Sequence, residues 1–323
     1  YRSGLYGGTV MTLRAAPPNR SSRDVNLLSD ACSIRLTDAY ESRGMIAAPI
    51  PLPIMEVEQE AEGIVTLWVQ VPHSMGLEYR SGQYYMCWNP YDAIGGMNRP
   101  NYHSEKPYSV GDIRTTHERT LLGFTVKDLG RQSGELTRLN VGDWLAIRGP
   151  FGTNFPSMSA GERLILVSGG IGSTPMHMAA RDARCILGDN IRIDAVMGFQ
   201  NSSESHYISR MEKICDSLQV YTNDGSLGTA GFPTDSLPDL LEDHHDGRTV
   251  LFTCGPEQMM KPVLQIAVNS RIECYAAMER YLPCSVAVCG LCMVGNRLTC
   301  RDGPIMDGIW LLHQEDFGLP HSH

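Results

Sequence analysis

The chain has 323 residues, of which 42% are hydrophobic and 20% are charged, and its formal net charge is −9 at pH 7. This length suffices for two or three domains with separate cores, and the acidic balance argues against a surface that binds nucleic acid or an anionic membrane. No apolar run reaches the ~18 residues of a membrane span, and no continuous apolar leader is visible near the start.

The distribution of cysteines indicates the compartment. Ten cysteines in a chain of this length do not form a disulfide scaffold. Four are clustered near the C-terminus and six are scattered, which fits a reducing compartment and one metal centre. We therefore expect a cytoplasmic protein.

Residues 1–52 contain Arg, Ser and Pro with weak periodicity, and we expect an extension here rather than a domain. An Arg- and Ser-rich start is also typical of an organellar transit peptide. Asp24, Asp30, Asp38 and Glu41 count against that interpretation, because transit peptides are poor in acidic residues.

Residues 53–157 show the pattern of short strands. Alternating or β-branched stretches, separated by Gly, Pro, Asn and Asp, predict strands at 64–71, 83–88, 107–110, 121–126 and 144–148. Strands at this spacing, with little helical periodicity, favour a small antiparallel β-barrel.

Residues 158–269 alternate between strand and helix patterns. The predicted strands are 164–168, 191–198 and 250–253, and the predicted helices are 177–187, 208–216 and 258–268. This alternation favours a Rossmann-like α/β domain, in which helices cover a parallel sheet.

A glycine-rich turn, SGGIGSTP at 168–175, joins the first of these strands to its helix. Glycines let the backbone approach a pyrophosphate, and the start of a helix offers free N–H groups. The candidate nucleotide-binding residues here are Gly170, Gly172, Ser173 and Thr174. A plain tight turn is the alternative.

A second nucleotide-binding candidate, Cys254-Gly255-Pro256, follows the last strand of the same region. The carboxyl edge of a parallel sheet is where a nicotinamide ring would lie. Taken alone, Cys254 fits a packed core thiol better. Its position after a strand of the nucleotide domain favours a wall of the site.

The barrel region carries a candidate flavin site. The run KPYS offers a cation for phosphate, an aromatic ring for a flat cofactor and a small hydroxyl. The run DLGRQSGEL offers a hydroxyl and backbone N–H groups for a second pyrophosphate contact. The alternative for KPYS is a solvated turn. The candidate residues are Lys106, Pro107, Tyr108, Ser109, Gly130, Ser133 and Gly134.

The last region, 270–323, holds four cysteines spaced C-x4-C-x2-C-x7-C. A C-x4-C-x2-C run with a more distant fourth thiolate is typical of a [2Fe–2S] cluster. Structural zinc usually uses two C-x2-C pairs, of which only one is present. A zinc site and four unrelated buried thiols remain the alternatives. The candidate metal ligands are Cys284, Cys289, Cys292 and Cys300.

The order of these motifs resembles the ferredoxin–NADP reductase superfamily with a C-terminal iron–sulfur appendage. More narrowly, the chain resembles the electron-transfer subunit of class 1B dihydroorotate dehydrogenase, the PyrK family. The resemblance extends over roughly residues 53–310. It rests on the stretches KPYSV, RGPFGTNF, VSGGIGSTPM, YTNDGSLGTAGFPTD, TCGPEQMMKPV and ERYLPCSVAVCGLCMVG.

The resemblance implies a redox subunit of pyrimidine biosynthesis. FAD would lie on the barrel, NAD would lie across the glycine-rich turn and the Cys-Gly-Pro segment, and the four cysteines would hold the cluster. Electrons would come from an FMN-containing catalytic subunit that oxidises dihydroorotate, in a heterotetramer. They would pass through the cluster and FAD to NAD+. We expect no acid–base dyad and no catalytic side chain, because the chemistry belongs to the cofactors.

Three positions differ from the residues that are usual in this family. The family usually has Arg where Lys106 stands, so the phosphate contact loses a bidentate fork. Ser285 stands where a glycine is common, and Ala287 replaces another small residue. No Arg cluster follows the second strand of the nucleotide domain, which favours NAD over NADP, with Arg210 as a possible exception.

Two other functions fit the same motifs. One is an FAD/[2Fe–2S] subunit that oxidises NAD(P)H in another complex, of the ferredoxin–NADP transhydrogenase, sulfhydrogenase or sulfite reductase type. The other is a non-catalytic interaction module that carries zinc on a degenerate reductase scaffold. Function has to be decided at the site, because the fold is shared.

Overall fold

The computed structural model describes residues 49–72, 79–91, 105–116 and 119–319. Most of the predicted N-terminal extension, and the transit-peptide alternative with it, therefore lies outside the described residues.

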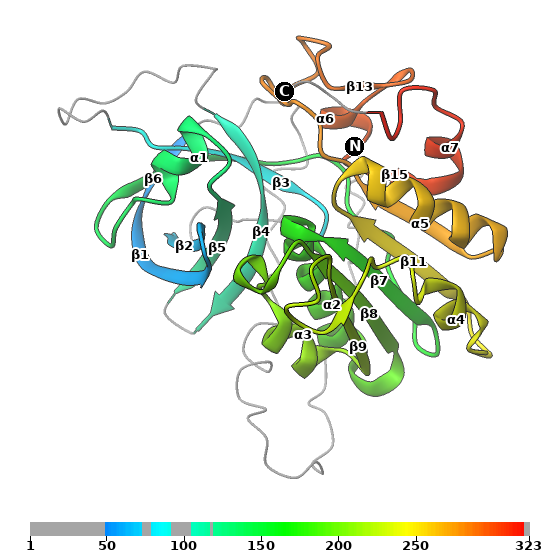
Figure 1. Ribbon diagram of the computed structural model, residues 1–323. Helices are drawn as coiled ribbons and strands as arrows, with labels where there is room; N and C mark the ends of the chain where they lie inside the picture. Colours follow the sequence, from blue (N-terminus) through cyan, green and yellow to red (C-terminus); the bar gives the residue numbers. More distant parts are fainter. Residues whose placement is uncertain (1–48, 73–78, 92–104, 117–118, 320–323) are drawn as a thin grey trace, which may run out of the picture.

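The first part of the chain folds as a closed barrel of six antiparallel strands in the order β1-β2-β5-β4-β3-β6 (Figure 1). The strands are β1 (Ile50–Ala61), β2 (Ile64–Val71), β3 (Tyr84–Trp88), β4 (Lys106–Thr115), β5 (Thr120–Lys127) and β6 (Trp144–Phe151). Alternate residues point inward, so that Leu122, Phe124 and Val126 of β5 all lie in the barrel core. The short helix α1 (Arg131–Leu136) follows β5.

The second part contains a sheet of seven strands in the order β10-β9-β8-β7-β11-β12-β15, in which only β15 runs antiparallel to its neighbour. The strands are β7 (Arg163–Gly169), β8 (Arg192–Phe199), β9 (Ser217–Thr222), β10 (Thr229–Ala230), β11 (Thr249–Cys254), β12 (Glu273–Ala277) and β15 (Ile305–Asp307). Every residue of β7 is buried, as expected for a central parallel strand covered on both faces.

Helices cover both faces of this sheet. They are α2 (Ser173–Leu187), α3 (Ile208–Ile214), α4 (Leu237–Glu242), α5 (Glu257–Asn269) and α7 (Gly308–Leu312), with short 3-10 turns η3 (Gly170–Gly172), η4 (Gly188–Asn190) and η5 (Ser202–Glu204). Residues of α2 and α3 share one core with Leu164 and Leu166 of β7. Residues of α4, α5 and α7 share the opposite core with Ile165 and Val167.

The cysteine-bearing segment follows β12 and contains a two-stranded ribbon, β13 (Met293–Val294) and β14 (Arg297–Leu298), and helix α6 (Thr299–Asp302). The chain then returns to the large sheet as β15. Both β12 and β15 come from the region assigned above to the cluster domain. The domain boundaries themselves stay a prediction.

The predicted fold class, a flavin-type barrel followed by a Rossmann-like sheet, is confirmed. The structure differs from the expected elements at their ends, and it contains strands β1 and β9, which the sequence did not predict; β1 begins at Ile50, inside the expected extension 1–52. Helix α2 begins at Ser173 rather than 177, because the helix starts directly from the glycine turn. Strand β12, ECYAA, was missed because it is short and carries Glu and Ala, which are poor strand formers.

Helix α2 joins the two parts. The carbonyl of Ile113 in β4 accepts a 2.6 Å hydrogen bond from Arg181 of α2, and Asp112 pairs with the same guanidinium at 3.3 Å. His177 of α2 lies 2.8 Å from the carbonyl of Gly111. The helix that begins at the glycine turn is therefore fixed against the barrel. Among the residues described, every helix is too short or too polar to span a lipid bilayer.

Candidate functional site

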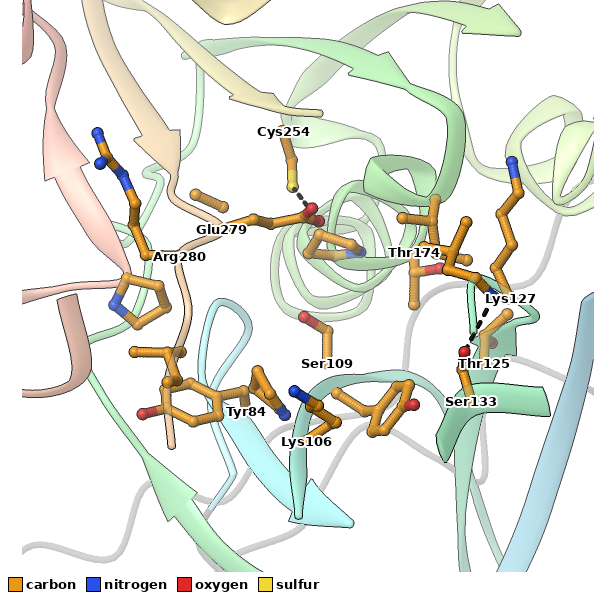
Figure 2. A pocket seen from close by; sticks show the side chains of 18 of the residues that line it. Tyr84, Lys106, Ser109, Thr125, Lys127, Ser133, Thr174, Cys254, Glu279 and Arg280 are labelled. Carbon is orange, nitrogen blue, oxygen red and sulfur yellow. Dashed lines mark hydrogen bonds between the residues drawn. The ribbon is translucent and has the colours of Figure 1, made fainter. Parts of the chain in front are cut away.

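A cavity of about 810 Å³ lies between the barrel and the carboxyl edge of the sheet (Figure 2). Strands β4 and β5, the start of α2, and the ends of β11 and β12 all contribute to its lining. Parallel strands present their carboxyl ends at one edge, which is where α/β proteins bind nucleotides.

The cavity gathers eight of the fourteen predicted cofactor-binding residues. They are Lys106, Pro107, Tyr108, Ser109, Gly130, Ser133, Thr174 and Cys254. The other six lie in the same segments without lining it. They are Gly134, Gly170, Gly172, Ser173, Gly255 and Pro256. The roles assigned to all fourteen stay predictions.

The glycine turn brings α2 close to the end of β11. Gly170 has φ +53° and open space around it, whereas a Cβ at Gly172 would overlap the carbonyl of Cys254. Within the described part of the chain, no side chain caps the N-terminus of α2. The helix dipole favours an anion at this end of α2.

The barrel side of the cavity carries the KPYS residues. The Lys106 ammonium lies 4.7 Å from the centre of the Tyr281 ring. Tyr108 donates a 3.0 Å hydrogen bond to Gln132, and burial raises the pKa of its hydroxyl. The Ser133 hydroxyl accepts from the N–H of Leu129 at 2.9 Å.

The sheet side carries a pair that the sequence did not reveal. Cys254 Sγ lies 3.9 Å from a carboxylate oxygen of Glu279, and burial raises the pKa of both groups. Figure 2 shows Ser109 on the barrel side and this pair on the sheet side of the same cavity. Glu279 was missed because strand β12, which ends two residues before it, was not predicted.

The four candidate cysteines lie together after β12, with Cys292 and Cys300 buried and Cys289 exposed. The thiols of Cys284 and Cys289 lie close together, and the thiol of Cys300 lies near those of Cys292 and Cys284. Burial raises the pKa of Cys284, but N–H groups of Val286 and its neighbours outweigh this and lower the pKa to about 7.

The choice of metal rests on the cysteine spacing. A C-x4-C-x2-C run with a more distant fourth thiolate is typical of a two-iron centre. Structural zinc usually uses two C-x2-C pairs, of which only one is present.

The loop around the cysteines is held in an unusual backbone conformation. Ser285 and Ala287 have φ of 57° and 60°, a region that favours glycine. The Ser285 hydroxyl lies 2.9 Å from the sulfur of Met86 in β3. Ser285 and Ala287 therefore adopt a backbone conformation that is strained for residues with a Cβ, and contacts with the barrel offset that strain.

The cavity and the cysteine loop share one wall. Tyr84 of β3 lines the cavity and also packs against Cys292 and Cys300. Arg148 of β6 is buried, pairs with Glu105 at 2.6 Å, and donates a 3.2 Å hydrogen bond to the carbonyl of Cys284. None of these contacts follows from the spacing of residues in the sequence.

Two buried histidines, His177 and His206, are hydrogen-bonded in the interior. His206 lies 2.7 Å from the Ser173 hydroxyl, and His177 stacks on Tyr207 at 4.9 Å. Arg210 pairs with Glu58 and Glu60 at 2.7 and 2.8 Å. Its charge is therefore already matched, which argues against the suggested role of Arg210 at a 2′-phosphate.

Comparisons with known proteins place the chain. It is 30% identical over 272 residues to the probable dihydroorotate dehydrogenase B (NAD(+)) electron transfer subunit of Methanocaldococcus jannaschii, covering 84% of this chain and 94% of that protein. It is 32% identical over 252 residues to the dihydroorotate dehydrogenase B (NAD(+)) electron transfer subunit of Clostridium perfringens, covering 77% and 92%. No family model matches the chain.

Solved structures share the fold. The NADH-dependent reduced ferredoxin–NADP oxidoreductase superposes with a TM-score of 0.66 at 24% identity, covering 80% of this chain and 88% of that one. The FAD/NAD-binding domain of nitric oxide dioxygenase from Vibrio cholerae superposes with a TM-score of 0.55 at 17% identity, covering 69% and 93%.

Proposed function

Because the chain belongs to the family of dihydroorotate dehydrogenase B (NAD(+)) electron transfer subunits, we propose that it carries electrons from an FMN-containing, dihydroorotate-oxidising subunit to NAD+ in pyrimidine biosynthesis. The proposal includes FAD, a [2Fe–2S] cluster, and assembly with the catalytic subunit as a heterotetramer. A cytoplasmic location is part of the proposal and rests on the cysteine pattern.

One observation carries the proposal. A single cavity contains both the KPYS residues and the start of α2, and one of its wall residues, Tyr84, belongs to the same buried cluster as Cys292 and Cys300. A one-electron centre and a hydride carrier have to lie close together if electrons are to pass between them. The fold supplies that proximity.

The lining of the cavity fits two nucleotides. On the barrel side, Lys106 supplies positive charge for phosphate, and Tyr108 supplies an aromatic face. On the sheet side, the buried hydroxyl of Thr174 has no hydrogen-bond partner among the described residues. A buried polar group of this kind is normally satisfied by a ligand or water.

We assign FAD to the barrel side, on Lys106, Pro107, Tyr108, Ser109, Gly130, Ser133 and Gly134. We assign NAD to the sheet side, on Gly170, Gly172, Ser173, Thr174, Cys254, Gly255 and Pro256. The [2Fe–2S] cluster would be held by Cys284, Cys289, Cys292 and Cys300, which would supply four thiolate ligands.

When bound, FAD exchanges single electrons with an iron–sulfur centre and a hydride with NAD. The protein supplies the surroundings. Cys254 and Glu279 both favour their neutral forms, because burial raises both pKa values. They would give the nicotinamide end a wall of little charge that keeps out water. Lys106 and the start of α2 would hold phosphates and thereby set the distance between the two rings.

The first test is Cys289→Ser, compared with Cys215→Ser as a matched control outside the loop. Serine oxygen is a poor ligand for iron in a thiolate site. Cys289→Ser should lose iron and acid-labile sulfide and should not accept electrons from the partner subunit, whereas reduction of a dye by NADH through FAD should persist. Cys215→Ser should behave as the unmodified protein.

The outcomes separate the alternatives. Normal electron transfer from the partner to Cys289→Ser would refute the proposed route. A colourless protein with stoichiometric zinc would support the interaction module instead. If the co-purifying FMN subunit does not oxidise dihydroorotate, the chain serves another redox complex.

A further inference from the structure

A chain of hydroxyl groups runs through the barrel wall and ends at the cavity. Thr66 of β2 donates a 2.6 Å hydrogen bond to a carboxylate oxygen of Glu60 in β1. The Thr66 and Thr125 hydroxyls lie 2.9 Å apart, and Thr125 lines the cavity. Each contact is short enough for a proton to be shared along it.

The register of the barrel creates this chain. Thr66 and Thr125 are direct partners in the β2–β5 ladder, so their side chains stand side by side on the same face. That face points away from the barrel core, which takes the alternate residues Phe124 and Val126. Both threonines are buried, and each hydroxyl can donate and accept at the same time.

The outer end of the chain is a carboxyl group near the surface. The Glu60 side chain is 7% exposed. Arg210 of α3 faces it at 2.8 Å, and Glu58 of the same strand shares that guanidinium. Burial raises the pKa of Glu60, and this outweighs the Arg210 pairing.

A branch of the chain leads to α3. The Tyr207 hydroxyl lies 2.6 Å from that of Thr125, and burial raises the pKa of Tyr207. Its ring lies between His177 and Arg210. Tyr207 therefore favours its neutral form, in which its hydroxyl can donate to Thr125 and hold the chain in place.

The proposed reaction consumes a proton at the cavity. Electrons that arrive singly from the cysteines leave as hydride, which is two electrons and one proton. One proton therefore has to reach the cavity for each NADH formed. When NADH reduces the flavin instead, the hydride brings its own proton and none is needed from solvent.

We propose that Glu60, Thr66 and Thr125 form a proton relay that supplies the cavity from the α3 side of the barrel. The proposal rests on FAD occupying the cavity. Glu60 takes a proton from water, passes one to Thr66 and regains its charge. Thr66 and then Thr125 each pass one proton on as they receive one, so neither hydroxyl changes its net protonation.

The test uses the full chain loaded with FAD and cluster, without oxygen. The flavin is reduced in one experiment by NADH and in another by reduced methyl viologen, a one-electron donor. Flavin absorbance reports reduction, and a pH indicator in weakly buffered solution reports proton uptake. The variant is Thr66→Val, which removes the hydroxyl and keeps the shape.

Reduction by methyl viologen should slow in Thr66→Val, with proton uptake slowed about 10²-fold, at the low end of what positioned proton transfer contributes. Reduction by NADH should be unchanged. Thr66→Ser should restore uptake. Thr115→Val is the matched control, since it removes a hydroxyl at the end of β4 that lies 3.5 Å from that of Thr120, the first residue of β5.

Other outcomes are equally decisive. Unchanged proton uptake in Thr66→Val overturns the relay. The relay is also overturned if proton uptake is slow in Glu279→Gln but normal in Thr66→Val, because protons would then enter on the sheet side. If Thr66→Val does not fold, Glu60→Gln carries the same comparison. If NADH does not bleach the flavin of the unmodified protein, this result contradicts the proposed function rather than the relay.

Discussion

At the scale of single residues, Lys106, which stands where the family usually has Arg, changes the expected contact with phosphate. The sequence predicted a cation at the flavin site, and Lys106 does line the cavity, half-buried and above the Tyr281 ring. An ammonium group is a point charge without the planar fork of a guanidinium. Its stacking on Tyr281, which lies three residues before Cys284, could not be predicted because these residues are far apart in the chain.

Lys106→Ala should weaken FAD binding about 10-fold or more, because a charged hydrogen bond contributes roughly 1.5–3 kcal/mol. Lys106→Arg should retain or strengthen binding. Flavin fluorescence after dilution measures the dissociation constant, and Lys213→Ala, an exposed lysine of α3, is the control. Unchanged flavin affinity in Lys106→Ala would contradict the assignment of this residue.

His206 should make stability depend on pH. Burial lowers its pKa to about 4 from an ordinary value of 6.5, so the unfolded chain binds a proton that the folded chain refuses. Stability should therefore fall as pH drops from 6.5 toward 4, by roughly 3 kcal/mol at most.

Urea unfolding at several pH values measures this loss. His206→Asn should flatten the curve in that window, although His177, whose pKa burial also lowers, keeps part of the slope. His244→Asn should leave the curve unchanged, because that side chain is 86% exposed. If the free energy of unfolding depends equally on pH in the unmodified protein, His206→Asn and His244→Asn, this would argue against the buried neutral state of His206.

At the scale of elements, the start of α2 depends on two glycines for different reasons. Gly170 needs its positive φ, whereas Gly172 needs the absence of a side chain against Cys254. The sequence predicted the turn from its glycines. It did not predict which glycine faces β11, since that depends on how closely the helix packs on the sheet.

Gly172→Ala should therefore cost more stability than Gly170→Ala. A Cβ at position 172 meets backbone, and overpacking of this kind costs about 1–3 kcal/mol. A Cβ at position 170 meets open space, and only the left-handed conformation costs, about 1 kcal/mol. Urea denaturation compares the two, and the reverse order would show that α2 can shift freely at its start.

At the scale of the whole molecule, the cysteine loop is fixed to the barrel by a buried ion pair. Arg148 and Glu105 are about 5% and 3% exposed, and Arg148 also holds the carbonyl of Cys284. The pair joins three segments that the sequence assigned to two different domains. A charge in such a position has to be paired, because an unpaired buried charge is costly.

Arg148→Met should destabilise the protein by about 3–5 kcal/mol, since it leaves Glu105 buried and alone. The double variant Arg148→Met/Glu105→Leu should recover much of this loss. Chemical denaturation measures both, with Arg301→Met at an exposed pair as the control, expected to change stability by less than about 1 kcal/mol. A double variant no more stable than the single one would mean that the pair itself matters less than the contact with Cys284.

The fold class, the glycine turn, the KPYS run and the four clustered cysteines can be recognised in the sequence alone, because each depends on residues close together in the chain. Local spacing is enough to predict a strand, a turn or a set of ligands. Three contacts could be seen only in the folded protein: Glu279 meets Cys254, Tyr84 lies between the cavity and the cysteines, and Thr66 aligns with Thr125. These contacts join distant segments, and their existence depends on the register and packing of the folded chain.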